Sequence, residues 1–244
     1  VGTDNDGLSS FNKQARVFKN YAFDPNNNKG LLSNKITSLL DDRSEILWIG
    51  TNAGINKIDR QGERFELFVR KPGMNNTWSS NNVQAIYKEI NGTVWIGTFD
   101  GGLNKYDPRT GKFTIYKSDD VLTDGMSLME HYRVLSKNKK KPKRYGKPDL
   151  LSNNRILSLH RDLNKTLWIG TGGGGLNKLD LESGDITVYK ANPDNADSLS
   201  DNFIRVIYED VDGTLWIGTL SGGVSTFTPG EAGSTIVAHE NTRL

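Results

Sequence analysis

The chain has 244 residues and a formal net charge of +2, with 31 Lys and Arg against 29 Asp and Glu. It contains no cysteine, which excludes disulfides and thiolate metal sites. No apolar run approaches the length of a membrane span and no signal peptide is visible, as we expect for a segment cut from a longer chain.

A short phrase, Trp-Ile-Gly-Thr, occurs four times along the chain. The intervals between its tryptophans are 47, 73 and 48 residues, so the long interval is one repeat with an insertion of about 25 residues. A fifth copy is cut by the start of the chain at Val1. An aliphatic residue precedes each tryptophan by 12 positions, at Ile36, Val83, Ile156 and Ile204. A fixed period of this length predicts a solenoid or a propeller.

Each repeat contains four short strand patterns separated by turns. The first is an apolar run rich in β-branched and aromatic residues, such as residues 204–208, and residues 214–219 form the second. Residues 102–107 and 112–116 show the third and the fourth, joined by a turn that contains Asp, Pro and Gly. We therefore expect four-stranded antiparallel blades, the unit of an all-β propeller.

In chain order, the repeats predict an incomplete ring of about four and a half blades. The expected ranges are a partial blade at 1–30, blades at 31–77 and 78–118, a basic insertion at 119–149, and blades at 150–198 and 199–244. Propellers protect their sheet edges by closing, so an open arc leaves strand edges free to pair with another chain.

The glycines in residues 167–180 (LWIGTGGGGLNKLD) raise the alternative of a phosphate-binding loop. Gly170, Gly172 and Gly175 have the spacing G-x-G-x-x-G after an apolar run. Such a loop needs a following helix, and the residues after Gly175 instead have the pattern of two short strands around a turn. Leu176 occupies the lysine position of the Walker pattern. The glycines therefore favour a tight turn between neighbouring blades, and no cofactor is expected.

These repeats resemble the two-component regulator propeller repeat through N-x-I-x-x-[LIV], D-G-x-L-W-I-G-T and G-G-L-x-x-[YFL]-D. The resemblance implies the periplasmic sensor region of a hybrid two-component receptor of the Bacteroidetes type. In that family the repeats usually form two seven-bladed propellers, followed by an immunoglobulin-like domain, a membrane helix and a cytoplasmic histidine kinase, and many members sense oligosaccharides. A seven-bladed ring needs roughly 330 residues, so 244 residues make an arc.

The family resemblance also implies partners for this segment. It would bind an oligosaccharide, act on its own kinase region through further ectodomain, and belong to a homodimer in the intact receptor. The segment itself would not be an enzyme.

The insertion carries the basic character of the chain. Residues 131–148 contain eight Lys and Arg and no acid, which leaves the rest of the chain at −6. Nucleic-acid binding would also require aromatic platforms, and only Tyr132 and Tyr145 are available. A solvated loop is the favoured interpretation, with no nucleic acid as partner. Residues 126–135 could form a short helix.

No catalytic or metal-binding pattern is present. The three histidines, His131, His160 and His239, lack metal-ligand spacing, and His160 falls at a strand position that favours packing. Carboxylates such as Asp59, Asp107 and Asp180 recur at strand ends, where turns use them. We expect no metal site, and no reaction can be assigned.

One end of the propeller is the predicted ligand face. If the first strand of each blade is innermost, the loop entering it and the glycine loop between the second and third strands lie at the same end. The entering loops share an asparagine that we expect to tie the turn: Asn34, Asn81, Asn154 and Asn202. The next position varies and gives the leading ligand candidates, Lys35, Asn82, Arg155 and Phe203.

Three further residues complete the candidate site. Phe99 and Asp100 lie in a glycine loop of the same end. Trp78 aligns with Leu31, Leu151 and Leu199, so it is either a hydrophobic plug or an exposed indole that stacks on a sugar ring.

Three functions remain open: a carbohydrate sensor, a polysaccharide lyase or hydrolase, and a ligand-free dimerising scaffold. A carboxylate pair or metal at the channel mouth would identify the enzyme, and a filled apolar channel the scaffold.

Overall fold

The structure is a computed structural model that describes residues 1–42, 45–59, 64–70, 73, 76–118, 150–229 and 236–239. The basic insertion and the helix predicted within it lie outside these residues. The described residues form strands and no helix, so none of them forms a helix that could cross a membrane.

Eighteen strands form five antiparallel sheets within the described chain. The first sheet has two strands, β1 (Leu8–Asn12) and β2 (Val17–Tyr21). The second consists of β3 (Ile36–Asp41), β4 (Ile46–Thr51), β5 (Gly54–Asp59) and β6 (Arg64–Phe68). The third consists of β7 (Val83–Lys88), β8 (Val94–Thr98), β9 (Leu103–Asp107) and β10 (Lys112–Tyr116).

The last two sheets repeat this pattern. The fourth consists of β11 (Ile156–Arg161), β12 (Thr166–Thr171), β13 (Leu176–Asp180) and β14 (Ile186–Tyr189). The fifth consists of β15 (Ile204–Glu209), β16 (Leu215–Thr219), β17 (Val224–Phe227) and β18 (Ile236–His239). Each sheet pairs its strands in chain order, as the four-stranded blade requires.

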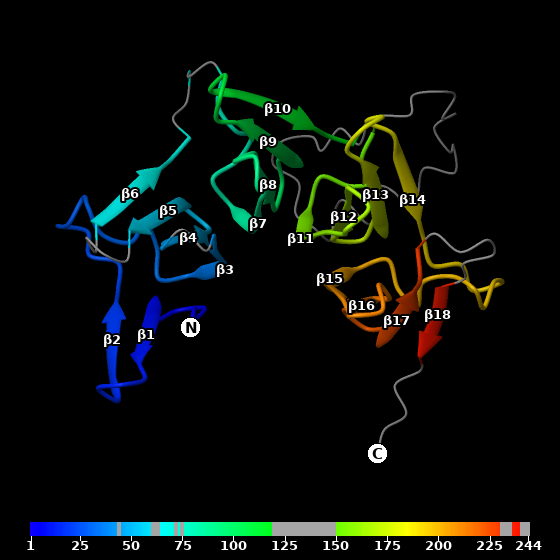
Figure 1. Ribbon diagram of the computed structural model, residues 1–244, viewed down its shortest axis with the longest axis horizontal. Coiled ribbons are helices and arrows are strands. Elements are labelled where there is room, and N and C mark those ends of the chain that lie inside the picture. Colours follow the sequence, from blue (N-terminus) through cyan, green and yellow to red (C-terminus); the bar gives the residue numbers. More distant parts are fainter. Residues whose placement is uncertain are drawn as a thin grey trace, which may run out of the picture.

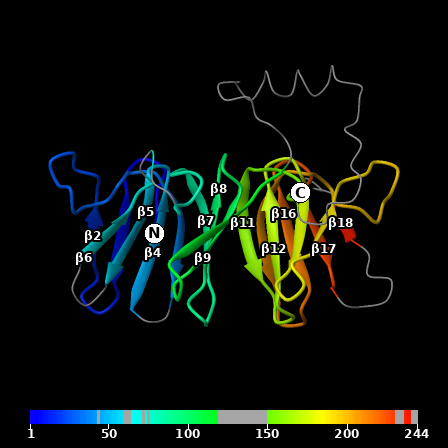
Figure 2. The same ribbon diagram turned by 90° about the horizontal axis from the view of Figure 1, so that it is seen from above.

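The five sheets lie around an open arc, with the β1–β2 sheet at one end and the β15–β18 sheet at the other (Figure 1). The strands run between two loop-bearing ends of the arc (Figure 2). The first strands lie on the concave side, where β3 contacts β7, β7 contacts β11 and β11 contacts β15. This arrangement confirms the all-β propeller architecture, and the sheets do not close into a ring within the described residues.

Every innermost strand contains a β-bulge at the same register. In β11, Ile156 pairs with Thr171 and Ser158 pairs with Gly170, so one residue between them is skipped. The same shift occurs in β3, β7 and β15. A bulge increases the local bend and twist, and its repetition gives all four first strands the same entry from the loop before them.

The cores lie in the seams between neighbouring sheets. Trp168 faces the next sheet: it packs with Ile207, Leu215 and Phe227 of the fifth sheet, and its side chain is fully buried. Trp95 packs in the same way against the fourth sheet. Burial of these large aromatic surfaces, together with the aliphatic residues that cover them, stabilises each seam.

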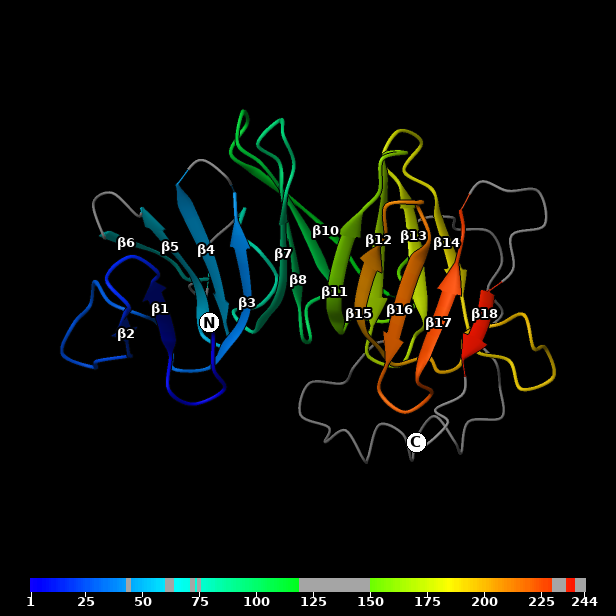
Figure 3. The same ribbon diagram turned by 60° about the horizontal axis from the view of Figure 1, so that its bottom comes forward.

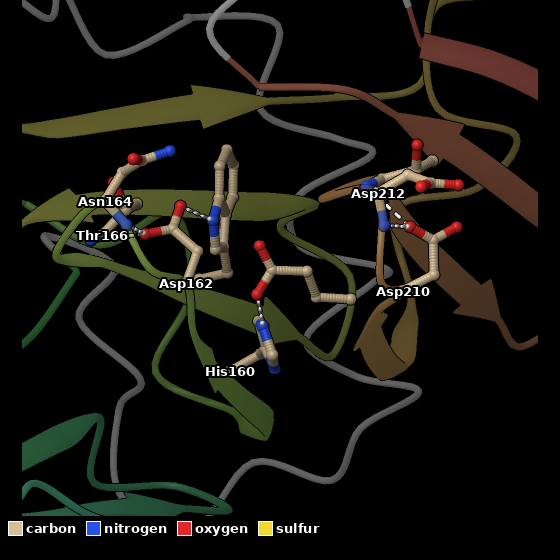
Figure 4. A network of polar contacts seen from close by, with 9 residues as sticks. His160, Asp162, Asn164, Thr166, Asp210 and Asp212 are labelled. Atoms are coloured by element: carbon tan, nitrogen blue, oxygen red, sulfur yellow. Dashed lines mark hydrogen bonds and ion pairs between the residues drawn. The ribbon is translucent and has the colours of Figure 1, made fainter.

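Polar contacts also join the innermost strands across the seams. Lys88 forms an ion pair of 2.6 Å with Asp42, and His160 Nε2 lies 2.9 Å from Glu209 Oε2 (Figure 4). Burial raises the pKa of Tyr87, while the charge of Arg161 and a hydrogen bond to it act in the opposite direction. These contacts lie at the end of the strands opposite the glycine loops.

Candidate functional site

The entering loops are tied down by the asparagine that recurs in them. The Asn154 Oδ1 accepts a hydrogen bond from the Ser118 N–H at 2.8 Å, which joins the loop to the segment after the preceding sheet's last strand. Equivalent bonds run to Asn34, Asn81 and Asn202 from Phe23, Arg70 and Ala191. The prediction that this asparagine has a structural role is confirmed.

A second set of polar side chains, on the strands next to these loops, also fixes the loops by hydrogen bonds. Asn177 is fully buried in β13. Its Oδ1 accepts a hydrogen bond from the Ser152 N–H at 2.8 Å, and its Nδ2 donates one to the Ser152 hydroxyl at 2.7 Å. The Thr171 hydroxyl donates to the Gly175 carbonyl at 2.7 Å and accepts from the Gly174 N–H. Buried hydrogen bonds from the repeated residues therefore hold the loops at this end. The residue after the recurring asparagine makes none of these bonds from its side chain, so it can differ between repeats.

The glycine loop between β12 and β13 is a tight turn, as the sequence indicated. Gly175 has a φ of +87°, and a Cβ at this position would lie 2.2 Å from the Tyr189 carbonyl oxygen. The strand β13 begins at the next residue, so no helix N-terminus is present to hold a phosphate.

Each of the four variable residues lies immediately before the innermost strand of its sheet, and three of them meet the preceding sheet. Lys35 forms an ion pair of 2.7 Å with Asp4 at the first seam. The Arg155 guanidinium lies over the Phe99 ring, 4.1 Å from its centroid, across the seam between the third and fourth sheets. Phe203 forms an isolated antiparallel bridge with Gly172 across the last seam. Asn82 accepts a hydrogen bond from Gln84 within its own sheet.

Arg155, Phe99 and Phe203 form a strip across the last three sheets. A Cβ on Gly172 would lie 2.2 Å from Arg155 Cδ, so the glycine leaves room for the arginine side chain. The Phe203 carbonyl accepts a hydrogen bond from the N–H of Leu220, whose side chain is exposed. Asp100 is exposed beside Phe99. Together these residues present an aromatic surface with one cation fixed over an aromatic ring. Lys35 lies at the first seam, whereas Asn82 adjoins the strip, because its carbonyl accepts a hydrogen bond from the Phe99 N–H at 2.9 Å.

Asp201 fixes the backbone beneath Phe203. It accepts hydrogen bonds from the Phe203 N–H at 3.1 Å and from the Ser221 hydroxyl at 2.7 Å. Burial alone would raise the pKa of Asp201, but the hydrogen bonds from Ser221 and from the backbone outweigh it and lower the pKa. The ionised carboxylate therefore holds the entering loop and the glycine loop of the fifth sheet together.

The candidate Trp78 requires a correction, because it does not lie on the exposed face. Its side chain is 6% exposed, its indole N–H lies 3.2 Å from Asn81 Oδ1, and its ring packs edge-on against Phe113 at 5.8 Å. Leu31, Leu151 and Leu199 at the aligned positions are also buried. Trp78 is the hydrophobic plug of its loop, and in this arrangement no sugar ring could stack on it.

Sequence reasoning named Phe99, the partner of Arg155, but missed the other residues that contact the variable positions. Asp4, Gly172 and Leu220 all follow a Gly-Thr pair, as Phe99 does. An alignment of that position across the repeats would have found them. Within the described residues, no group of three or more His, Asp or Glu side chains could hold a metal ion.

Three parts of the chain match the sequence profile of the family described as two component regulator propeller: residues 30–53, 77–100 and 198–221. A search of curated proteins by sequence finds no match.

Solved structures share the fold. The extracellular domain of BT3049 from B. thetaiotaomicron, named as a hybrid two component system, is 20% identical, with a TM-score of 0.66 over 93% of this chain and 29% of that one. The β-propeller domain of Cps50 (Swd1) from Myceliophteria thermophila is 12% identical, with a TM-score of 0.55 over 93% of this chain and 62% of that one. The chain therefore spans less than a third of the BT3049 extracellular domain, and at these identities the likeness concerns the fold alone.

Proposed function

Because three of its repeats match the two component regulator propeller, we propose that this chain is a ligand-sensing part of a two-component receptor. It would lie in the extracellular or periplasmic region and control a histidine kinase encoded outside these residues. The matched structure of BT3049 is named as an extracellular domain, which supports this location. Signalling would require that the ligand bind two receptor arrangements with different affinities.

We further propose that the ligand is an oligosaccharide and that it binds on the strip formed by Phe99, Arg155 and Phe203. The observation that carries this proposal is the contact of the Arg155 guanidinium with the Phe99 ring across a seam, in a loop system whose other repeated residues are structural. An aromatic face packs on the apolar side of a sugar, and a guanidinium donates hydrogen bonds to its oxygens.

Calorimetric titration with a panel of neutral and acidic oligosaccharides tests this proposal, with each mixture also assayed for turnover. Arg155→Ala and Phe99→Ala should each weaken binding by about tenfold or more. The matched control is Arg109→Ala, because Arg109 is exposed in the turn between β9 and β10 at the opposite end. Absence of binding across the panel would contradict the sensor proposal, and release of products would identify an enzyme instead.

A further inference from the structure

Two turns at the end of the arc opposite the glycine loops carry exposed aliphatic side chains. Ile90, in the turn between β7 and β8, is fully exposed, and Leu163, in the turn between β11 and β12, is 90% exposed. The third and fourth sheets, to which these turns belong, each have a neighbouring sheet on both sides. Their exposure therefore does not depend on the two ends of the arc. Both turns lie at the upper end of the strands in Figure 3.

Neither turn needs an aliphatic side chain at this position. The Asp162 carboxylate accepts hydrogen bonds from backbone N–H groups that follow Leu163, and the Asn91 side chain does the same after Ile90. These bonds form the turn, so a polar residue could occupy either position. Val211 is the aligned residue of the next repeat, so three consecutive repeats have an aliphatic residue here. Recurring apolar side chains that the fold leaves in water indicate an interaction surface.

The outer turns of the same two sheets differ in charge. Residues 107–112, between β9 and β10, contain two cations and one acid, and the Arg109 side chain is 82% exposed. Residues 180–185, at the turn between β13 and β14, contain three acids and no cation. Of these acids, Glu182 forms an ion pair with Lys165, and both Glu182 and Asp185 are exposed. This end of the arc is therefore positive at the third sheet and negative at the fourth.

The charges complement one another in one symmetric arrangement of two copies. A two-fold axis that passes between the third and fourth sheets lays the third sheet of each copy over the fourth sheet of the other. Ile90 then meets Leu163 of the second copy, and the turn with Arg109 meets the turn with Asp185. An axis through the fourth sheet would instead place its three acids on themselves. An anionic lipid surface is also less favourable, because the same acids would face it.

We propose that two copies of this chain associate end to end through this surface, with Ile90 of each copy packed on Leu163 of the other. The aliphatic contact excludes water, and the turns at 107–112 and 180–185 select the register by their opposite charges. This proposal is independent of the ligand proposed above, because the surface lies at the opposite end of the strands from Arg155.

Sedimentation velocity of the chain from about 1 to about 100 µM tests the association. The unmodified chain should form dimers as its concentration rises. Ile90→Asp and Leu163→Asp should each raise the dissociation constant by about tenfold or more. Ile115→Asp is the matched control, because Ile115 is 42% exposed on the outer strand β10, away from these turns, and it should associate as the unmodified chain does.

Charge reversal tests the register. Arg109→Glu and Asp185→Arg should each weaken the dimer, because the two turns that meet then carry charge of the same sign. The double variant should recover most of the lost affinity, since the acidic turn and the basic turn have exchanged places in both copies. Near-UV circular dichroism checks that every variant folds, and Leu163→Lys replaces Leu163→Asp if that variant does not.

A monomeric unmodified chain, unchanged association of Leu163→Asp, or a double variant as weak as the single ones would overturn the proposal. Vesicles of phosphatidylcholine and phosphatidylglycerol distinguish a membrane as the occupant. If the chain stays monomeric and sediments with the vesicles while Ile90→Asp does not, this surface binds lipid and the dimer proposed here is wrong.

Discussion

The indole N–H of Trp168 donates a hydrogen bond to Oδ2 of Asp162, with 2.9 Å between the two atoms. The other carboxylate oxygen accepts from the backbone N–H of Asn164 and of Thr166 (Figure 4). The same relation joins each repeated tryptophan to an acid six residues earlier: Trp48 to Asp42, Trp95 to Glu89 and Trp216 to Asp210. The acid of the first turn thus orients the side chain that fills the seam.

Asp162→Ala should destabilise the fold by about 2–3 kcal/mol. The carboxylate is buried, so its removal leaves the Trp168 indole N–H and two backbone N–H groups without an acceptor in a site that water does not readily enter. Urea unfolding followed by tryptophan fluorescence measures the loss.

The matched control is Asp210→Ala. Trp216 is 43% exposed, so water can replace the lost acceptor, and the destabilisation should be clearly smaller. Equal losses for the two variants would contradict the idea that burial makes the bond at Asp162 costly to remove.

Gly175→Ala should cost about 3 kcal/mol, because it adds both backbone strain and a collision with the Tyr189 carbonyl. Gly184→Ala separates the two effects: its φ is +84°, but no atom lies within 4 Å of the added carbon. This control should cost about 1 kcal/mol, which thermal unfolding of both variants can resolve. Similar losses would show that the close approach at Gly175 is relieved by small shifts.

Asp201 should make the fifth sheet less stable in acid. Its pKa is lowered from the ordinary 3.8 in the folded chain, so the ionised group stabilises the fold above that value, and the contribution is lost as the pH falls through the lower folded pKa. Urea midpoints from about pH 6 to about pH 3 should therefore fall more for the unmodified chain than for Asp201→Asn. If the difference in urea midpoint between the unmodified chain and Asp201→Asn stayed constant across this pH range, a lowered pKa of Asp201 would be contradicted.

Trp78→Leu should cost about 2 kcal/mol, because the plug loses its contact with Phe113 while a leucine at that position still fills part of the site. Since the indole does not reach the exposed strip, the substitution should leave unchanged the affinity for any oligosaccharide that Arg155→Ala weakens. Calorimetry on both variants compares the two, and a parallel loss of affinity would place Trp78 at the ligand.

The strand order and the blade architecture could be predicted from the sequence because each repeat contains the same local sequence patterns. Alternating apolar runs, turn residues and a fixed period specify hairpins, and consecutive hairpins specify a blade. The asparagine of the entering loop could be assigned a structural role for the same reason, since it recurs in every copy. Trp78 could not be placed, because an indole suits a plug and a platform equally until its burial is known.

The sequence by itself determined the all-β propeller repeat, the end of the blades at which the variable residues gather, and the turn role of the glycines, because each depends on contacts between residues near one another in the chain. Only the tertiary structure showed that Arg155 lies over Phe99, that Asp162 holds Trp168, and that Trp216 remains exposed. The Arg155 contact depends on how whole sheets pack at a seam, and the Asp162 bond on the direction of a side chain, which the repeat leaves open.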